Sequence, residues 1–228
     1  MIAGGGLRRA WPLLAAAAYG PVLVAATGLV PAWGRWYTAS PFYREQVDAL
    51  LHGRLALSAD PAALRHDLAW AGGGVQQVWG LGVPLWRLVP EAVARWVGAA
   101  GFPGMVCFAL ALSLAAWLVV RALRDPGLPG PPVRTPSLPG LPLAGGALLL
   151  LGAPPFVNLL HSRFEIWEEA VAYEYVWGLA LAAALVRLAV RPTPRRLGLV
   201  CVLAGWGGLV RPTLVLSGFG ALAAGRGS

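Results

Sequence analysis

Long apolar runs that contain no charged residue constrain this sequence more than any other feature. One run separates Arg9 from Arg35, and another separates Arg95 from Arg121. Each is long enough for the roughly 20 apolar residues that a helix needs to cross a bilayer. Because lipid offers the backbone no hydrogen-bond partner, a spanning segment must be a helix or part of a closed barrel. These runs are too long and too uniformly apolar for barrel strands, so we expect an all-α protein.

Composition supports a polytopic membrane protein with five to six transmembrane helices. Only 12% of the residues are charged, against about 25% in a soluble domain. We expect one transmembrane domain in which a long ordered external loop, residues 33–96, follows the first span, and a cytoplasmic Pro/Gly-rich linker, residues 121–140, follows the second. The spans that can be placed cover residues 10–32, 97–120, 141–160, 173–190 and 197–224.

The arginines predict the orientation of the chain. It contains no Lys, and its net charge is +8. With the N-terminus in the cytoplasm, the segments on that side carry nine Arg and one acid, whereas the two external loops carry seven Arg and nine acids. Arg is enriched on the cytoplasmic side of membrane proteins. We therefore expect a multi-pass protein of the bacterial inner (plasma) membrane. Its basic excess reflects topology and contact with membrane lipid, and nucleic acid is not an expected partner.

The segment from Pro41 to Leu57 is predicted to be an amphipathic helix lying on the membrane. Arg44, Asp48 and His52 recur at every fourth position and therefore share one helix face. A carboxylate that a neighbouring cation keeps ionised, near a surface of low dielectric, is suited to act as a general base. The same spacing is also typical of solvated ion pairs. Asp48 is therefore either a candidate base or an ion-pair partner.

Further candidates follow in the same loop. His66 and Asp67 precede three glycines, residues 72–74, which suit a turn or the close approach of a ligand. Three tryptophans also lie here, and they could stack on sugar rings or form the aromatic belt of a helix that re-enters the membrane. These tryptophans are Trp70, Trp79 and Trp86.

The second external loop is acidic. Glu165, Glu168 and Glu169 lie close together at the start of a predicted helix. Glu168 and Glu169 are candidate ligands for a divalent cation, since carboxylates are the ligands that such hard cations prefer. A solvated acidic helix end has the same composition, and both interpretations stay open.

Arg211 is placed unusually. It follows Arg196 by 15 positions, or about 22 Å of helix, which is shorter than the roughly 30 Å core of a bilayer. Arg211 therefore either ends a short helix that does not span or lies within the membrane, where ionisable residues usually line a cavity. Its guanidinium group suits a phosphate.

The order of these features resembles the polytopic glycosyltransferases of the GT-C class, such as the protein-mannosyltransferase-like and aminoarabinose-transferase-like enzymes. The resemblance rests on one helix followed by a long loop, then on a glutamate pair at a helix start and an Arg-Pro-Thr after a basic turn. The Asp-Glu pair often found early in this loop in that class is absent here. The stretches that carry the resemblance are Tyr43, Asp48-Ala49-Leu50-Leu51-His52-Gly53-Arg54-Leu55, His66-Asp67-Leu68-Ala69, a glycine stretch, Pro84, Glu168-Glu169-Ala170 and Gly205 to Arg211-Pro212-Thr213.

The resemblance implies a function and assigns roles to residues. Enzymes of this class use a polyprenyl-phosphate sugar donor and an external-loop carboxylate near the membrane. Asp48 is then the first candidate for the catalytic carboxylate and Asp67 the second, and Arg211 would hold the donor phosphate. The other candidate substrate-binding residues are Arg44, His52 and His66. The chain would be the N-terminal portion of such an enzyme. The alternative is a non-catalytic membrane subunit or a permease component.

Overall fold

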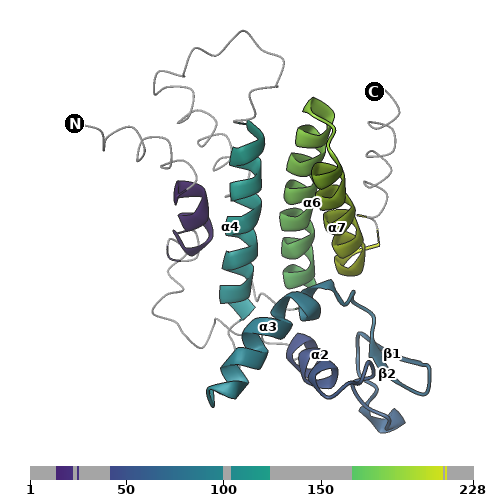
Figure 1. Ribbon diagram of the computed structural model, residues 1–228. Coiled ribbons are helices and arrows are strands. Elements are labelled where there is room, and N and C mark those ends of the chain that lie inside the picture. The colour runs from purple at the N-terminus through teal and green to yellow at the C-terminus, as the bar shows by residue number, and fades with distance from the viewer. Residues whose placement is uncertain are drawn as a thin grey trace, which may run out of the picture.

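The computed structural model describes residues 14–22, 25, 42–99, 104–123, 166–212 and 214. These residues are mostly helical, and they form a helical bundle with a smaller unit at one end (Figure 1). We refer to residues 42–99 as the loop unit. In chain order the elements are α2 (Phe42–Leu51), η2 (Pro61–Ala63), β1 (Leu68–Ala71), β2 (Gly74–Gln77), α3 (Gly82–Trp96), α4 (Gly104–Leu123), α6 (Ile166–Val190) and α7 (Pro194–Val210).

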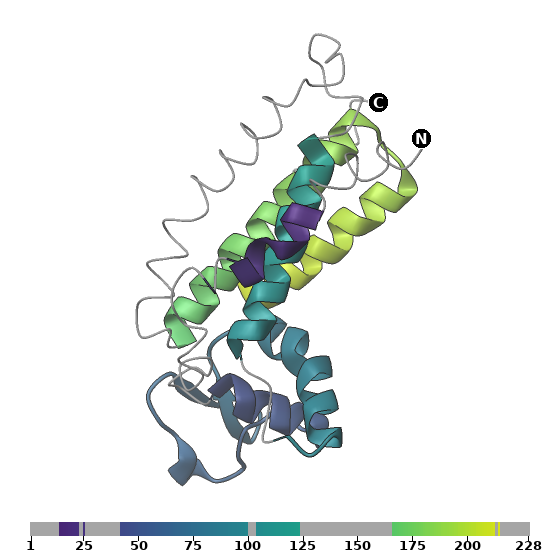
Figure 2. The same cartoon turned by 90° about the vertical axis from the view of Figure 1, so that its left-hand side faces the viewer.

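Helices α4, α6 and α7 form the bundle, and the loop unit lies at one end of it in both views (Figure 1, Figure 2). Gly104, at the start of α4, and Glu169, in the first turn of α6, both lie against Arg87 of the loop unit. The end of α7 reaches the same place, since Val210 packs on Gly82. Helices α4 and α6 therefore run in the same direction, and α7 runs back towards the loop unit.

Two of the described helices are long and apolar enough to cross a membrane. They are α4, with 20 residues, and α6, with 25 residues. At about 1.5 Å per residue both reach the roughly 30 Å of a bilayer core. Each carries an arginine in its last turn, Arg121 and Arg187 respectively. The prediction of membrane-spanning helices is supported to this extent.

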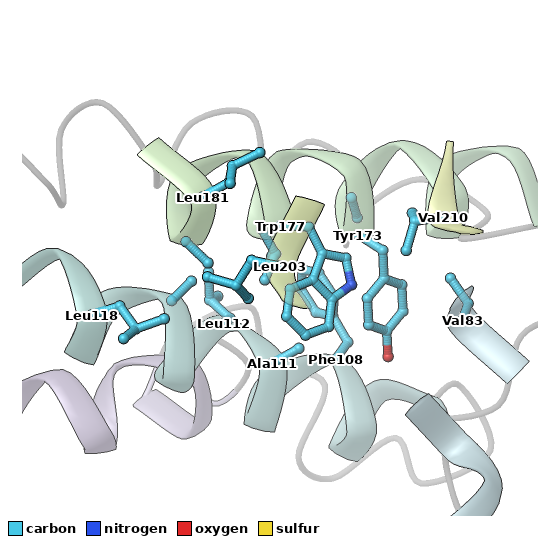
Figure 3. Packing of buried hydrophobic residues seen from close by; sticks show 14 of the residues in the cluster. Val83, Phe108, Ala111, Leu112, Leu118, Tyr173, Trp177, Leu181, Leu203 and Val210 are labelled. Carbon is cyan, nitrogen blue, oxygen red and sulfur yellow. The ribbon is translucent and has the colours of Figure 1, made fainter. Parts of the chain in front are cut away.

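Aromatic rings and alanines fill the interior of the bundle (Figure 3). Phe108 of α4 meets Tyr173 of α6 edge to face at 5.5 Å between ring centroids. Trp177 lies one turn further along α6 and packs on Trp206 of α7. Alanines such as Ala111 are buried on the contact face of α4. Small residues let helices approach closely, and in lipid it is this van der Waals packing that holds helices together.

The described part of the first predicted span is helical and packs on α4. The backbone N–H of Gly20 donates to Ser113 Oγ at 3.0 Å. A side chain at Gly20 would collide with the carbonyl of Ala109, so glycine is required by this close approach. The rest of the span predicted at 10–32, the span predicted at 141–160 and residues 124–140 of the predicted linker lie outside the described residues.

Several boundaries differ from those predicted. The span predicted at 97–120 begins at Gly104, because Gly98 takes a left-handed conformation (φ 79°) and ends α3 before it. Helix α6 begins at Ile166, ahead of the predicted 173. Helix α7 ends at Val210, and Arg211 is extended (φ −148°, ψ 131°) ahead of Pro212. The predicted span at 197–224 is therefore interrupted, and Arg211 ends a 17-residue helix.

Helix α2 is shorter than predicted and its buried face contacts protein. It ends at Leu51, because Gly53 (φ 70°) allows the backbone N–H of Arg54 to reach back to the Ala49 carbonyl at 2.8 Å. This is the helix C-terminal motif that glycine favours. Tyr43 and Val47 are buried where α2 packs on α3. The predicted end of this helix at Leu57 is thus corrected to Leu51.

The described residues are mostly helical, as predicted, but the loop unit also contains a β-hairpin that the prediction of an all-α chain did not include. Strands β1 and β2 pair antiparallel, with Ala71 opposite Gly74. Gly72 (φ 59°) and Gly73 (φ 79°) form the turn between them. Two consecutive left-handed residues define the tight turn that matches the twist of paired strands. The glycines were predicted to form a turn, but four-residue strands are too short to show a clear alternation of apolar and polar residues.

Candidate functional site

An open cleft of about 460 Å³ lies on the loop unit, between α2, the turn after it and the C-terminal end of α3. Four arginines and two acids line it, so its formal charge is positive. We call it the arginine cleft. Its charged lining residues are Arg44, Glu45, Asp48, Arg54, Arg65 and Arg95. Of the three residues predicted to share a helix face, Arg44 and Asp48 line this cleft and His52 does not; Arg54, Arg65 and Arg95 complete its basic lining.

Asp48 lies at the centre of a hydrogen-bonded group in this cleft. Arg95 Nη1 donates to Asp48 Oδ1 at 2.6 Å, and about two-fifths of each side chain is exposed. His52 Nδ1 lies 2.8 Å from the backbone oxygen of Asp48 and 3.8 Å from its carboxylate. The hydrogen bond from Arg95 lowers the pKa of Asp48. The carboxylate is therefore ionised at neutral pH and is a weaker base while that bond is in place.

The other charges leave the cleft with an excess of guanidinium. Arg65 Nη2 donates to Glu45 Oε2 at 3.0 Å and its guanidinium lies over the ring of Phe42. Among the described residues, the Arg54 guanidinium makes no hydrogen bond or ion pair. Because arginine presents a planar fork of donors, it binds phosphate and carboxylate through two parallel hydrogen bonds. The arrangement is suited to an anion placed next to Asp48.

His66 and Asp67 lie apart from this group. Asp67 takes a left-handed conformation (φ 66°) just before β1, and its backbone oxygen accepts from Val78 N at 3.4 Å, closing the base of the hairpin. The Asp67 side chain is mostly buried, and the exposed His66 Nε2 lies 3.6 Å from it. Neither residue is among those lining the arginine cleft. The structure therefore gives Asp67 a role in the turn.

Arg211 also lies outside the cleft. It follows the last residue of α7, and its Nη1 donates to Glu174 Oε2 of α6 at 2.8 Å. The guanidinium is partly exposed at the end of the bundle that contacts the loop unit. The structure thus chooses the first of the two predicted placements, a helix end, and gives Arg211 a carboxylate partner that sequence reasoning did not identify.

A second charged cluster, which sequence reasoning missed, is completely buried between α3 and α6. Arg87 binds Glu91 one turn along α3, with Nη2 2.7 Å from Oε1, and it binds Glu169 of α6 at 3.3 Å. All three side chains have no exposed area. Burial lowers the pKa of Arg87, but Glu169 and Glu91 raise it by more, so the guanidinium stays charged. Arg87 and Glu91 are four positions apart, a spacing that could have indicated an ion pair along one helix.

This buried cluster bears on the predicted cation site. Glu168 and Glu169 are neighbours on α6, but Glu169 Oε1 accepts from Arg87. Within the described ranges, no group of three or more His, Cys, Asp or Glu residues could hold a metal ion. A guanidinium already supplies the positive charge at Glu169. Among the described residues, Glu168 and Glu169 therefore do not form the predicted divalent-cation site.

Comparison with known proteins gives no further guide, because no family model, curated protein or solved structure matches this chain. The function is therefore inferred from the residues of the arginine cleft and from its place at the end of the apolar helices.

Proposed function

We propose that this chain is a membrane glycosyltransferase, or the N-terminal portion of one. It would transfer a sugar from a polyprenyl-phosphate donor to an acceptor on the external face of the bacterial inner membrane. One observation carries the proposal: a carboxylate, Asp48, lies among four arginines in an open cleft at one end of long apolar helices. A lipid-linked sugar has the matching parts, which are an apolar chain, a phosphate and a reactive sugar carbon.

The donor phosphate would bind the arginines that exceed the carboxylates. Arg54 is the first candidate because its guanidinium makes no hydrogen bond or ion pair within the described part of the chain. Arg44 lines the same cleft from the face of α2 that carries Asp48. Since the loop unit lies at one end of the bundle, the polyprenyl chain of a phosphate held here would have to extend from the loop unit to α4 and α6. Charge-assisted bonds of this kind are about twice as strong as neutral ones.

Asp48 would act as the general base. Its carboxylate takes the proton of an acceptor hydroxyl, the hydroxyl oxygen forms a bond to the anomeric carbon, and the bond from that carbon to the phosphate oxygen breaks. The polyprenyl phosphate leaves with the electron pair, and the anomeric configuration inverts. The hydrogen bond from Arg95 weakens the base in the free protein. A donor phosphate that competes for Arg95 would raise the basicity of Asp48 when substrate is bound.

The charges of the bundle support the orientation in this proposal. Arg121, Arg187 and Arg196 lie at the end of the bundle away from the loop unit, in the last turns of α4 and α6 and the first turn of α7. The opposite end carries Glu169 and Glu174. An arginine-rich end is the cytoplasmic end by the usual charge rule. The loop unit and the arginine cleft would then be external, and the N-terminus cytoplasmic in a multi-pass chain.

Transfer of a labelled sugar from polyprenyl phosphate, measured in membranes that contain the complete protein, tests the proposal. The variant Asp48→Asn keeps the shape of the side chain and removes the base. A positioned base accelerates proton transfer about 10²–10⁴-fold, so we expect a loss of that order. Asp67→Asn is the matched control, because Asp67 lies in the same unit but outside the cleft. Unchanged transfer by Asp48→Asn would favour the alternative of a non-catalytic membrane subunit, in which Arg95 and Asp48 are only an ion pair.

A further inference from the structure

A second cleft, of about 340 Å³, lies beside the hairpin and is chemically unlike the first. Gln46 of α2 lines it together with Gln76 and Gln77 of β2 and with Trp79. Among the residues that the structure describes, no charged side chain contributes to its lining. We call it the amide cleft. Its volume is at the lower end of the range for small-molecule sites, so it suits one small ring and not an extended ligand.

The glutamines are concentrated in this cleft. The chain has only three, Gln46, Gln76 and Gln77, and all three line it. Gln46 is completely buried and Gln77 is 9% exposed. Glutamine is mostly exposed in proteins, since a buried amide is unfavourable unless its polar atoms are hydrogen-bonded. Two buried glutamines in a unit of this size therefore require a partner for their polar atoms.

The hydrogen bonds already present satisfy one side of each amide only. Gln46 Nε2 donates to the Leu55 carbonyl at 2.8 Å, and Gln77 Nε2 donates to the Gly80 carbonyl at 3.4 Å. These bonds engage the amide nitrogens and leave the amide oxygens without a partner. Gln46 Oε1, Gln77 Oε1 and the Trp79 Nε1–H group are all buried without a hydrogen-bond partner among the described residues. Two acceptors and one donor are thus unpaired in residues that line one cleft.

From this geometry we infer that the amide cleft binds the ring of a neutral sugar. Sugar hydroxyls donate to the two glutamine oxygens and accept from the Trp79 indole N–H, and the C–H face of the ring lies on the indole. Because these three atoms are buried in the free protein, binding would require the amides and the indole to turn toward the cleft. A uronate or an amino sugar would place a charge against an uncharged lining, which is unfavourable without a partner. The ligand class is therefore neutral.

The amide cleft and the arginine cleft are lined by neighbouring residues of the chain. That one ligand occupies both clefts is an inference that rests on the proposed function. The turn after α2 separates the two, since Arg54 lines the arginine cleft and Leu55 lines the amide cleft. On β2, Val75 lines the first and Gln76 lines the second. A lipid-linked sugar that reached both clefts would place its phosphate among the arginines and its sugar ring among the amides.

Ligand-observed NMR on the full chain, in micelles of a detergent without a sugar headgroup, tests the inference. The neutral probes are methyl glucopyranoside and methyl mannopyranoside, and the charged probes are glucuronate and glucosamine. We expect the neutral glycosides to bind and the charged sugars to bind at least about ten-fold more weakly. Gln46→Met and Gln77→Met keep the side-chain length and remove the acceptor. Each should weaken binding of the neutral glycosides about ten-fold, as expected for a lost buried hydrogen bond.

Matched variants separate this site from its surroundings. Trp70→Phe changes an exposed residue of β1 that lines neither cleft, and Arg95→Met changes the arginine cleft alone. Both should bind the neutral glycosides as the unaltered protein does. Trp79→Phe keeps an aromatic ring, removes the N–H donor and serves if a glutamine variant fails to fold.

The outcomes for the two proposals are distinct. If the unaltered protein binds none of the neutral glycosides, or if the glutamine and Trp79 variants bind them unchanged, the amide cleft is not a sugar site, and the proposed transfer reaction is unaffected. If glycoside binding depends on these residues while Asp48→Asn retains full transfer, the amide cleft is a sugar site and the proposed catalytic role fails.

Discussion

Helix α3 carries two arginines that bind carboxylates in opposite surroundings. Arg95 binds Asp48 in an open cleft, where 39% of the arginine side chain and 41% of the aspartate side chain are exposed. Arg87 binds Glu91 and Glu169 in a site with no exposed area. Water and salt screen the first pair, so a substrate anion can compete for its guanidinium. The second cluster has no such access, and its charges stabilise the contact between the loop unit and the bundle.

From this difference we infer that Arg95 takes part in function and that Arg87 stabilises the structure. Removing one member of a buried ion cluster leaves an uncompensated charge, whereas an exposed pair contributes at most about 1 kcal/mol. The comparison can be tested from both sides, by breaking the buried cluster and by breaking the exposed pair.

The largest effect is expected for Arg87→Met. The substitution leaves Glu91 and Glu169 buried without their cation, and breaking such a cluster usually destabilises a protein by about 3–5 kcal/mol. Thermal unfolding in detergent should show a large fall in Tm. The triple variant Arg87→Met, Glu91→Gln, Glu169→Gln removes all three charges and should recover part of that loss. A single variant as stable as the unaltered protein would contradict the structural role of the cluster.

A smaller effect is expected where α3 begins against the end of α7. A Cβ added at Gly82 would lie 2.6 Å from the backbone N of Val210, so Gly82→Ala forces backbone atoms apart. Overpacking of this kind costs about 1–3 kcal/mol. Gly198→Ala in α7 is the control, because nothing lies within 4 Å of its added Cβ. Thermal unfolding should give Gly82→Ala a clearly lower Tm than Gly198→Ala. Equal Tm values would mean that α3 and α7 do not pack closely.

The smallest change in stability is expected for Arg95→Met. The pH dependence of this change tests the exposed pair further. The hydrogen bond from Arg95 lowers the pKa of Asp48, so this pair stabilises the fold at pH values above the normal range of an aspartate. That stabilisation is lost as pH falls through the lowered pKa. Because the pair is exposed, the free energy of unfolding should change by no more than about 1 kcal/mol, and the change in Tm should be small and weaker in high salt.

The same variant should also move the acid side of the pH–activity profile. Without Arg95 the pKa of Asp48 returns towards its ordinary value, so the ionised base is lost at a higher pH. We therefore expect the acid limb of transfer activity to shift upward in Arg95→Met. A profile that does not move would show that the titrating group is not Asp48.

Sequence reasoning identified the features that depend on local spacing. It placed Arg44 and Asp48 on one helix face, and it located the apolar runs of α4 and α6. It extended α2 to Leu57 and began the next span at residue 97, although Gly53 and Gly98 take left-handed conformations just after α2 and α3. These glycines were readable signals.

The contacts that could not be predicted from the sequence join residues far apart in the chain. Asp48 and Arg95 are separated by 47 positions, and Arg87 and Glu169 by 82. Spacing along one helix cannot reveal such pairs, because they depend on how the loop unit folds and on where it meets the bundle. The predicted acidic cluster at Glu168 and Glu169 was therefore interpreted without its arginine partner.

The most direct measurement compares Asp48→Asn and Arg87→Met in one preparation of the complete protein, with sugar transfer and Tm recorded for both. The two variants should differ in which of these two quantities changes. Asp48→Asn should lose transfer by about 10²–10⁴-fold at a nearly unchanged Tm, whereas Arg87→Met should lower Tm while the protein that remains folded keeps its transfer activity. The account would be contradicted if Asp48→Asn transferred sugar at the unaltered rate, or if folded Arg87→Met lost transfer to the same degree.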